Sequence, residues 1–166
     1  THPTLKTIPV IMLTSSNFEI ELPTEKVKPI DAVSLSVEPL TLEMKYQGMV
    51  LVVEDEIHIQ VLLKEYLTLS GFNVITVSNG QLAFQMLQEI EPDLIISDIK
   101  MPTLDGIALY HKIAEQAPHL IQRYLFITGD TKTPETVNFL ARTGIPYIEK
   151  PFTLNILSEM LKSFYP

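Results

Sequence analysis

Five side chains at the ends of short strand-like runs could form one chemical site. Glu54 and Asp55 follow one such run, Asp98 ends a second, Thr128 ends a third, and Lys150 follows a fourth. The apolar runs among them are typical of strands buried on both faces of a parallel sheet. Because the carboxyl ends of parallel strands lie at the edge where open α/β sheets bind ligands, we expect these side chains to converge there.

Three carboxylates and a lysine in one place suit phosphoryl transfer. Two like charges about 4 Å apart repel each other by on the order of 4 kcal/mol at an effective dielectric constant near 20, so the carboxylates need positive charge nearby. Mg²⁺ prefers hard oxygen ligands and a phosphate partner, and it would share this role with Lys150. Thr128 can donate a hydrogen bond to a phosphoryl oxygen, and Asp98 is then the natural nucleophile, as in proteins that form aspartyl phosphates.

Each of these residues alone also has an ordinary explanation. Asp55 could cap a helix, Lys150 could be a solvated lysine, and Thr128 is a common strand residue. Their joint occurrence at the ends of four strands favours the functional interpretation.

Five strands that alternate with five helices must position these side chains. The sequence predicts strands over residues 49–53, 73–77, 94–98, 124–128 and 147–149, and helices over residues 57–69, 80–90, 106–115, 134–143 and 153–162. Such alternation implies a parallel sheet with right-handed crossovers. The predicted fold class is α/β, a flavodoxin-like doubly wound five-stranded parallel sheet of order 2-1-3-4-5 in three αβα layers, with two helices on one face and three on the other.

The composition limits the remaining classes of protein. The 166 residues suit one domain plus an extension, and the net charge of -8 argues against a general nucleic-acid or anionic-membrane binder. The absence of cysteine excludes disulfides, thiolate metal sites and a cysteine nucleophile. No apolar run approaches the roughly 20 residues of a membrane span. We therefore expect a cytoplasmic chain without direct membrane contact.

The motifs around the candidate residues resemble the receiver domain of two-component response regulators. The resemblance covers roughly residues 48–164, in the order and spacing of the family. The matching motifs are Leu51-Val52-Val53-Glu54-Asp55-Glu56, Ser97-Asp98-Ile99-Lys100-Met101-Pro102 with Asp105-Gly106, Thr128-Gly129, and Tyr147-Ile148-Glu149-Lys150-Pro151-Phe152.

The resemblance implies a phosphoacceptor in a two-component phosphorelay. Asp98 would accept a phosphoryl group from a histidine kinase or a histidine phosphotransfer protein. Mg²⁺, or Mn²⁺ in its place, would bind Asp98, Asp55 directly, Glu54 through water, and the main-chain carbonyl of Lys100. Such a domain catalyses its own phosphorylation and dephosphorylation without being a free-standing enzyme.

Three further residues fall on functional positions of the family. Lys150 matches its characteristic lysine, and Thr128 and Tyr147 match the pair that switches conformation on phosphorylation. The family therefore implies a signalling face formed by the fourth helix, fifth strand and fifth helix, which is also a candidate for weak self-association.

Two residues at the predicted mouth of the site could control how long the phosphoryl group lasts. Lys100 lies two positions after Asp98, and Asp130 lies two positions after Thr128. In this fold they would overhang the site from adjacent strands, where an ion pair could hinder the attacking water. The alternative is two solvated side chains that never meet.

Three other functions compete with this interpretation. A flavin-binding protein needs a phosphate loop after the first strand, where Glu54 and Asp55 would repel the phosphate. An aspartate-nucleophile phosphatase would have a second carboxylate at the position of Lys100. A phosphorylation-dead scaffold would not need the intact acidic set.

The first 47 residues are expected to be a remnant of a preceding domain plus a proline-containing linker, with the receiver domain over residues 48–166. Residues 15–23 resemble the closing strand of a histidine-kinase ATP-binding domain, and residues 5–14 alternatively resemble a strand of another receiver. The chain begins with Thr, and residues 143–146 replace the acidic pair of DNA-binding regulators. We therefore expect the C-terminal receiver of a hybrid sensor histidine kinase.

Overall fold

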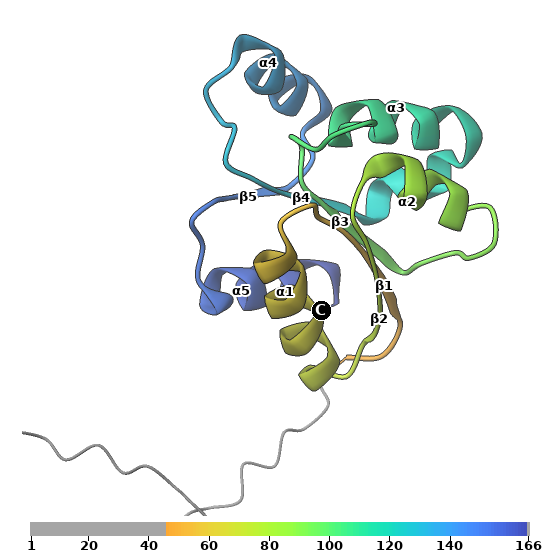
Figure 1. The fold of residues 1–166 in the computed structure, drawn as a ribbon. Coiled ribbons are helices and arrows are strands. Elements are labelled where there is room, and N and C mark those ends of the chain that lie inside the picture. Colours follow the sequence, from red (N-terminus) through yellow and green to blue (C-terminus); the bar gives the residue numbers. More distant parts are fainter. Residues whose placement is uncertain (1–45, 166) are drawn as a thin grey trace, which may run out of the picture. The chain divides into compact units, whose positions relative to one another are not determined.

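A five-stranded parallel sheet forms the centre of the protein. The computed structural model describes residues 46–165, so the predictions for residues 1–45 lie outside the described part. The strands pair in the order β2-β1-β3-β4-β5 (Figure 1), which confirms the predicted fold class. Their bounds are β1 Met49–Val53, β2 Asn73–Val77, β3 Leu94–Ser97, β4 Tyr124–Thr128 and β5 Tyr147–Glu149.

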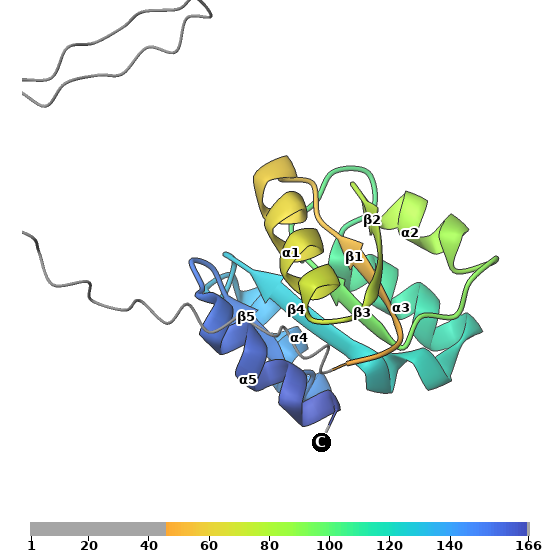
Figure 2. The same cartoon turned by 90° about the horizontal axis from the view of Figure 1, so that it is seen from below.

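The helices cover the two faces of the sheet in the predicted numbers. Helices α1 and α5 pack on one face, and α2, α3 and α4 pack on the other (Figures 1 and 2). Among residues 46–165, no helix has both the length and the apolar character needed to cross a bilayer. The bounds are α1 Ile57–Leu69, α2 Gly80–Met86, α3 Gly106–Gln116, α4 Pro134–Thr143 and α5 Leu154–Phe164, with a 3₁₀ helix η1 at Pro118–Arg123.

Five of these elements differ from the prediction, and α3 and α5 differ only at their ends, by one or two residues. Helix α2 ends at Met86 instead of residue 90, because the chain tightens into a turn in which the Glu89 N–H bonds to the Met86 carbonyl at 2.9 Å. Strand β3 ends at Ser97, one residue before Asp98. The 3₁₀ helix η1 was not predicted, although Pro118 suits its first turn.

Alternate residues of the strands supply two separate cores. On the face covered by α1 and α5, the side chains of β1, β3 and β4 meet leucines of both helices, and on the other face they meet an aromatic cluster from β4, α3 and α4. Burial of such a side chain stabilises the fold by about 1.5–3 kcal/mol. The first core includes Val50, Val52, Leu94, Ile96, Leu125, Ile127, Leu63, Leu67, Leu157 and Leu161.

The chain after β3 is held close to the start of α3. A Cβ atom at Gly106 would lie 2.1 Å from the Asp98 carbonyl oxygen, so this approach requires glycine. The Gly106 N–H donates to the Ile99 carbonyl at 2.8 Å, and the Asp105 carboxylate caps α3 by accepting from Ala108 N–H at 2.8 Å. These contacts fix the loop that carries Asp98.

The two ends of the described part pack against each other. The Tyr46 ring is buried, stacks on Phe72 with 5.0 Å between ring centroids, and lies 5.5 Å from the ring of Tyr165. The Tyr46 N–H also donates to the Ser70 carbonyl at 3.1 Å. The packed domain therefore includes Tyr46, two residues before the predicted start at residue 48.

Candidate functional site

The Lys150 ammonium lies among three carboxylates at the carboxyl edge of the sheet. Its Nζ atom is 2.7 Å from Asp98 Oδ2, 2.9 Å from Glu54 Oε2 and 3.3 Å from Glu56 Oε1. Glu54 and Glu56 follow β1, Asp98 follows β3, and Lys150 follows β5. The structure thus brings together residues that are up to 96 positions apart in the chain.

The Asp98 carboxylate is held by both of its oxygens. Oδ1 accepts from the main-chain N–H groups of Ile99 and Lys100, and Oδ2 accepts from Lys150. The Asp98 N–H continues the sheet pattern by donating to the Val53 carbonyl at 2.9 Å. Although only 6% of the residue is exposed, its carboxylate lines a solvent-accessible hollow. The side chain is therefore oriented before any reactant arrives.

Glu54 is the most deeply buried of these carboxylates, with 1% exposure. Burial raises the pKa of the Glu54 carboxyl, and its hydrogen bonds with Lys150 and the Glu56 N–H oppose that change. Burial would lower the pKa of Lys150, but hydrogen bonds to Asp98 and Glu54 outweigh it, so the pKa of Lys150 is raised. The lysine therefore stays protonated and balances part of the negative charge.

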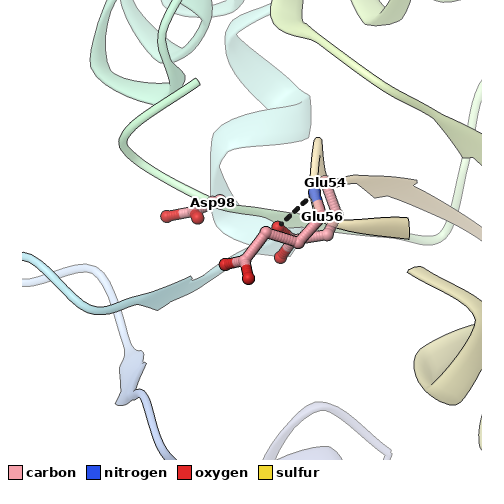
Figure 3. Close-up of side chains that lie close together, drawn as sticks. All are labelled: Glu54, Glu56 and Asp98. Atoms are coloured by element: carbon pink, nitrogen blue, oxygen red, sulfur yellow. Dashed lines mark hydrogen bonds between the residues drawn. The ribbon is translucent and has the colours of Figure 1, made fainter. Parts of the chain in front are cut away.

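Glu56 belongs to the cluster, which the sequence analysis did not anticipate. One carboxylate oxygen from each of Glu54, Glu56 and Asp98 lies within 4.8 Å of the others (Figure 3). Asp55 is not in this group, and it is exposed, but it lines the same hollow. The run of three consecutive acidic residues after β1 was the signal that could have identified Glu56.

The hollow above these groups can hold a phosphoryl group together with water. Its volume is about 440 Å³, against about 30 Å³ for each water of the liquid. Its walls come from the loops after β1, β3, β4 and β5. They are formed by Asp55, Glu56, Asp98, Lys100, Gly129, Asp130 and Lys150.

The charge at this edge favours a divalent cation. Glu54, Glu56 and Asp98 with Lys150 leave a net charge of -2 when all four groups are ionised. Carboxylate oxygens are the ligands that Mg²⁺ prefers in proteins. The donor set therefore fits Mg²⁺, although Lys150 now occupies the space between the carboxylates.

Thr128 and Tyr147 lie on adjacent strands in different environments. Thr128 is fully buried, and its Oγ1 accepts from the Asp130 N–H at 3.1 Å. Tyr147 is 44% exposed, and it pairs in register with Phe126, two residues before Thr128. In this structure, the Tyr147 ring of the predicted switch pair is exposed to solvent and the Thr128 side chain is buried.

The side chains of Lys100 and Asp130 form an ion pair at the rim of the hollow. Lys100 Nζ lies 3.3 Å from Asp130 Oδ2, and the two side chains are 50% and 14% exposed. The contact joins the loop after β3 to the loop after β4. The alternative in which these side chains never meet does not describe this structure.

A known protein family matches most of this chain, and its description fits the fold and the site. Residues 50–162 match the model of the response regulator receiver domain, and the chain belongs to that family. It therefore carries a receiver domain of the kind found in two-component systems.

Two curated relatives are regulators from Bacillus subtilis (strain 168). The alkaline phosphatase synthesis transcriptional regulatory protein PhoP is 33% identical over 114 residues, which are 69% of this chain and 47% of the relative. The probable C4-dicarboxylate response regulator DctR is 30% identical over 118 residues, 69% of this chain and 51% of the relative. The chain thus spans about half the length of the curated relatives it matches.

Two similar solved structures are receiver domains of histidine kinases. One is from the sensor histidine kinase PA1611 of Pseudomonas aeruginosa PAO1, with a magnesium ion in its active-site cleft. It is 25% identical, with a TM-score of 0.64, and 72% of this chain and 98% of that chain are covered. The other, from a signal transduction histidine kinase of Syntrophus aciditrophicus, is 31% identical, with a TM-score of 0.64, and 70% and 89% are covered.

Replacement of Lys150 by Met should destabilise the domain. The change leaves the buried Glu54 and Asp98 charges without their nearest cation, so we expect a loss of about 3–5 kcal/mol in the free energy of unfolding. Urea unfolding in EDTA measures this loss. Lys162→Met is the control, because Lys162 pairs with Glu159 in an exposed position and should cost at most about 1 kcal/mol. Equal small losses in both variants would show that the contact of Lys150 with the carboxylates does not stabilise the fold.

Proposed function

We propose that this domain accepts a phosphoryl group from a phosphohistidine onto Asp98 and changes conformation to transmit the signal. The observation that carries the proposal is the oriented Asp98 carboxylate, which lies 2.7 Å from Lys150 at the edge of a hollow rich in carboxylates. The donor would be a histidine kinase or a histidine phosphotransfer protein. The reaction belongs to the domain itself and does not make it a free-standing enzyme.

The chemistry requires one bond to form and one to break. An oxygen of the Asp98 carboxylate attacks phosphorus while the bond from phosphorus to the imidazole nitrogen of the donor breaks. Lys150 can remain beside the group and stabilise the charge on the phosphoryl oxygens. Because Thr128 Oγ1 accepts from the Asp130 N–H, its own proton is free to be donated to a phosphoryl oxygen.

Mg²⁺, or Mn²⁺ in its place, is the proposed cofactor. The ion would bind the carboxylates of Asp98 and Asp55 and the main-chain carbonyl of Lys100. Glu54 would act on it through water. The acidic cluster also offers Glu56 as a ligand. The magnesium ion in the similar receiver of Pseudomonas aeruginosa supports this part of the proposal. When bound, the ion neutralises charge that develops on the phosphoryl group.

The signal would leave the site through Thr128 and Tyr147. A phosphoryl group on Asp98 would draw the Thr128 hydroxyl inward, and the exposed Tyr147 ring could then enter the space that Thr128 vacates. This exchange would shift the face of α4, β5 and α5 between two states. The same face is the proposed surface for weak self-association.

The parent protein is proposed to be a hybrid sensor histidine kinase in the cytoplasm. The two histidine-kinase receivers among the similar structures support this placement. The curated relatives instead support a transcriptional response regulator as a second candidate. In either protein the receiver would contact a phosphohistidine-bearing partner and neither nucleic acid nor membrane.

Asp98→Asn should abolish phosphorylation. The amide has the shape of the carboxylate but lacks its nucleophilic oxygen, so the variant should stay unmodified. The protein without substitutions and the variant are each incubated with acetyl phosphate and Mg²⁺, and their intact masses are measured. We expect one added phosphoryl group in the former and none in the variant. Glu159→Gln, on the exposed side of α5, serves as the control. Equal mass gain in Asp98→Asn would refute the assignment.

Metal affinity should separate Asp55 from Glu56. If Asp55 is the direct ligand, Asp55→Asn should weaken Mg²⁺ binding by about tenfold or more, and Glu56→Gln should weaken it less. Titration with Mg²⁺ and with Mn²⁺ can be followed by NMR shifts and by relaxation, respectively. A larger effect of Glu56→Gln would assign the metal to the Glu54, Glu56 and Asp98 group instead.

Lys100→Asn should shorten the lifetime of the phosphoryl group. The change removes the ion pair with Asp130 and places a side chain that can orient water beside Asp98. An exposed pair is worth up to about 1 kcal/mol, so the rate of hydrolysis should rise by at most roughly fivefold through the lost pair. Asp130→Ala should have a smaller effect. Loss of phosphate from the purified protein at fixed Mg²⁺ and pH is the measurement. An unchanged or longer half-life in Lys100→Asn would remove this residue from control of signal duration.

A further inference from the structure

Asp130 is a junction between the site and helix α4. Its N–H donates to Thr128 Oγ1 at 3.1 Å, and its Oδ2 lies 3.3 Å from Lys100 Nζ. The same Oδ2 accepts hydrogen bonds from the hydroxyls of Thr133 at 2.6 Å and Thr136 at 2.8 Å. Its Oδ1 accepts from the Thr133 N–H at 3.1 Å. One residue thus contacts the end of β4, the loop after β3 and the first turn of α4.

The α4 side of this junction is stronger than the Lys100 side. The Thr133 hydroxyl, with further donors from Thr136 and the Thr133 N–H, holds the pKa of Asp130 well below its usual range. Hydrogen bonds to an ionised acceptor are the strong ones. Lys100 is half exposed and its contact is longer. Loss of Lys100 therefore leaves the carboxylate in place, whereas loss of the Thr133 and Thr136 hydroxyls removes its two shortest contacts.

Thr136 is the buried member of this network. Its side chain is fully buried, so its hydroxyl cannot exchange its hydrogen bond to Asp130 for one to bulk water. An unsatisfied buried hydroxyl is costly, and the pairing of Thr136 with Asp130 is therefore strongly favoured. Any inward movement of Thr128 that carries the Asp130 N–H with it must stretch this contact or move the start of α4.

We propose that Thr136 is a positioning residue, which acts through Asp130 to hold the Thr128 hydroxyl and the Lys100 ammonium at the phosphorylation site. Helix α4 thereby affects the chemistry at Asp98 as well as receiving its signal. The effect on the lifetime of the phosphoryl group rests on the proposed phosphorylation of Asp98. The effect on the positions of Thr128 and Lys100 concerns the unphosphorylated protein alone.

Thr136→Val tests the inference, because valine keeps the shape of threonine and removes the hydroxyl. Phosphoryl half-life is measured after labelling with acetyl phosphate and Mg²⁺. We expect Thr136→Val to shorten it by about two- to fivefold, and the double variant with Asp130→Ala to have the half-life of Asp130→Ala alone. Thr136→Ser should restore most of the half-life. Thr143→Val is the matched control on α4, since the Thr143 hydroxyl bonds only within its own helix, to the Phe139 carbonyl at 2.8 Å.

NMR of the unphosphorylated protein provides a second measurement. Thr136→Val should move the signals of the Asp130 amide, the Thr128 methyl and the Lys100 side chain, and Thr136→Ser should return them toward their original positions. Thr143→Val should leave them unchanged. A general loss of packing would not produce this pattern of rescue.

The two measurements separate this inference from the proposed function. If the protein without substitutions takes no phosphoryl group at Asp98, the proposed function fails. The inference is then decided by the NMR signals of Asp130, Thr128 and Lys100 in the Thr136 variants. If that protein is labelled but Thr136→Val has the same half-life, or its effect adds fully to that of Asp130→Ala, the inference is wrong and the proposed function stands.

Discussion

The contact between the Lys150 ammonium and the carboxylates of Glu54, Glu56 and Asp98 is the constraint on which the site depends. These carboxylates would repel one another at the strand ends, and the lysine offsets part of that repulsion. The sheet order makes the contact available, because β5 carries Lys150 toward the edge where β1 and β3 end. The two apolar cores in turn hold these strands in register, so burial far from the site fixes distances within it.

The site violates the usual rules of a stable interior, and it does so where chemistry is proposed. Glu54 is almost fully buried, and one lysine does not neutralise three carboxylates. Local conflicts of this kind are expected at functional positions and are offset by stability elsewhere in the fold. The excess negative charge is what makes the edge suited to a divalent cation.

Most of the fold could be predicted from the sequence because the strands are apolar, evenly spaced and bounded by turn residues. Helix α2 was predicted too long because Leu87 and Ile90 continue its apolar spacing, and spacing does not reveal a terminal turn. The site residues could be named from their strand ends, and the acidic run after β1 indicated Glu56 only as one of three neighbouring carboxylates, without showing which of them turn toward Lys150. The links from Asp130 to Thr133 and Thr136 depend on side-chain orientation in a loop, which no sequence pattern specifies.

The packing of Tyr46 against Phe72 and Tyr165 has a consequence for how the domain meets its partners. It joins the first and the last described residues at the amino end of the sheet. Asp98 lies at the opposite, carboxyl edge. A segment that precedes Tyr46 would therefore join the domain at the end opposite Asp98. If the parent protein is the proposed hybrid kinase, encounter with its phosphohistidine would be governed by effective concentration, and hence by the length and stiffness of the tether. Changes in the tether could tune the rate of encounter while every distance within the site stayed the same.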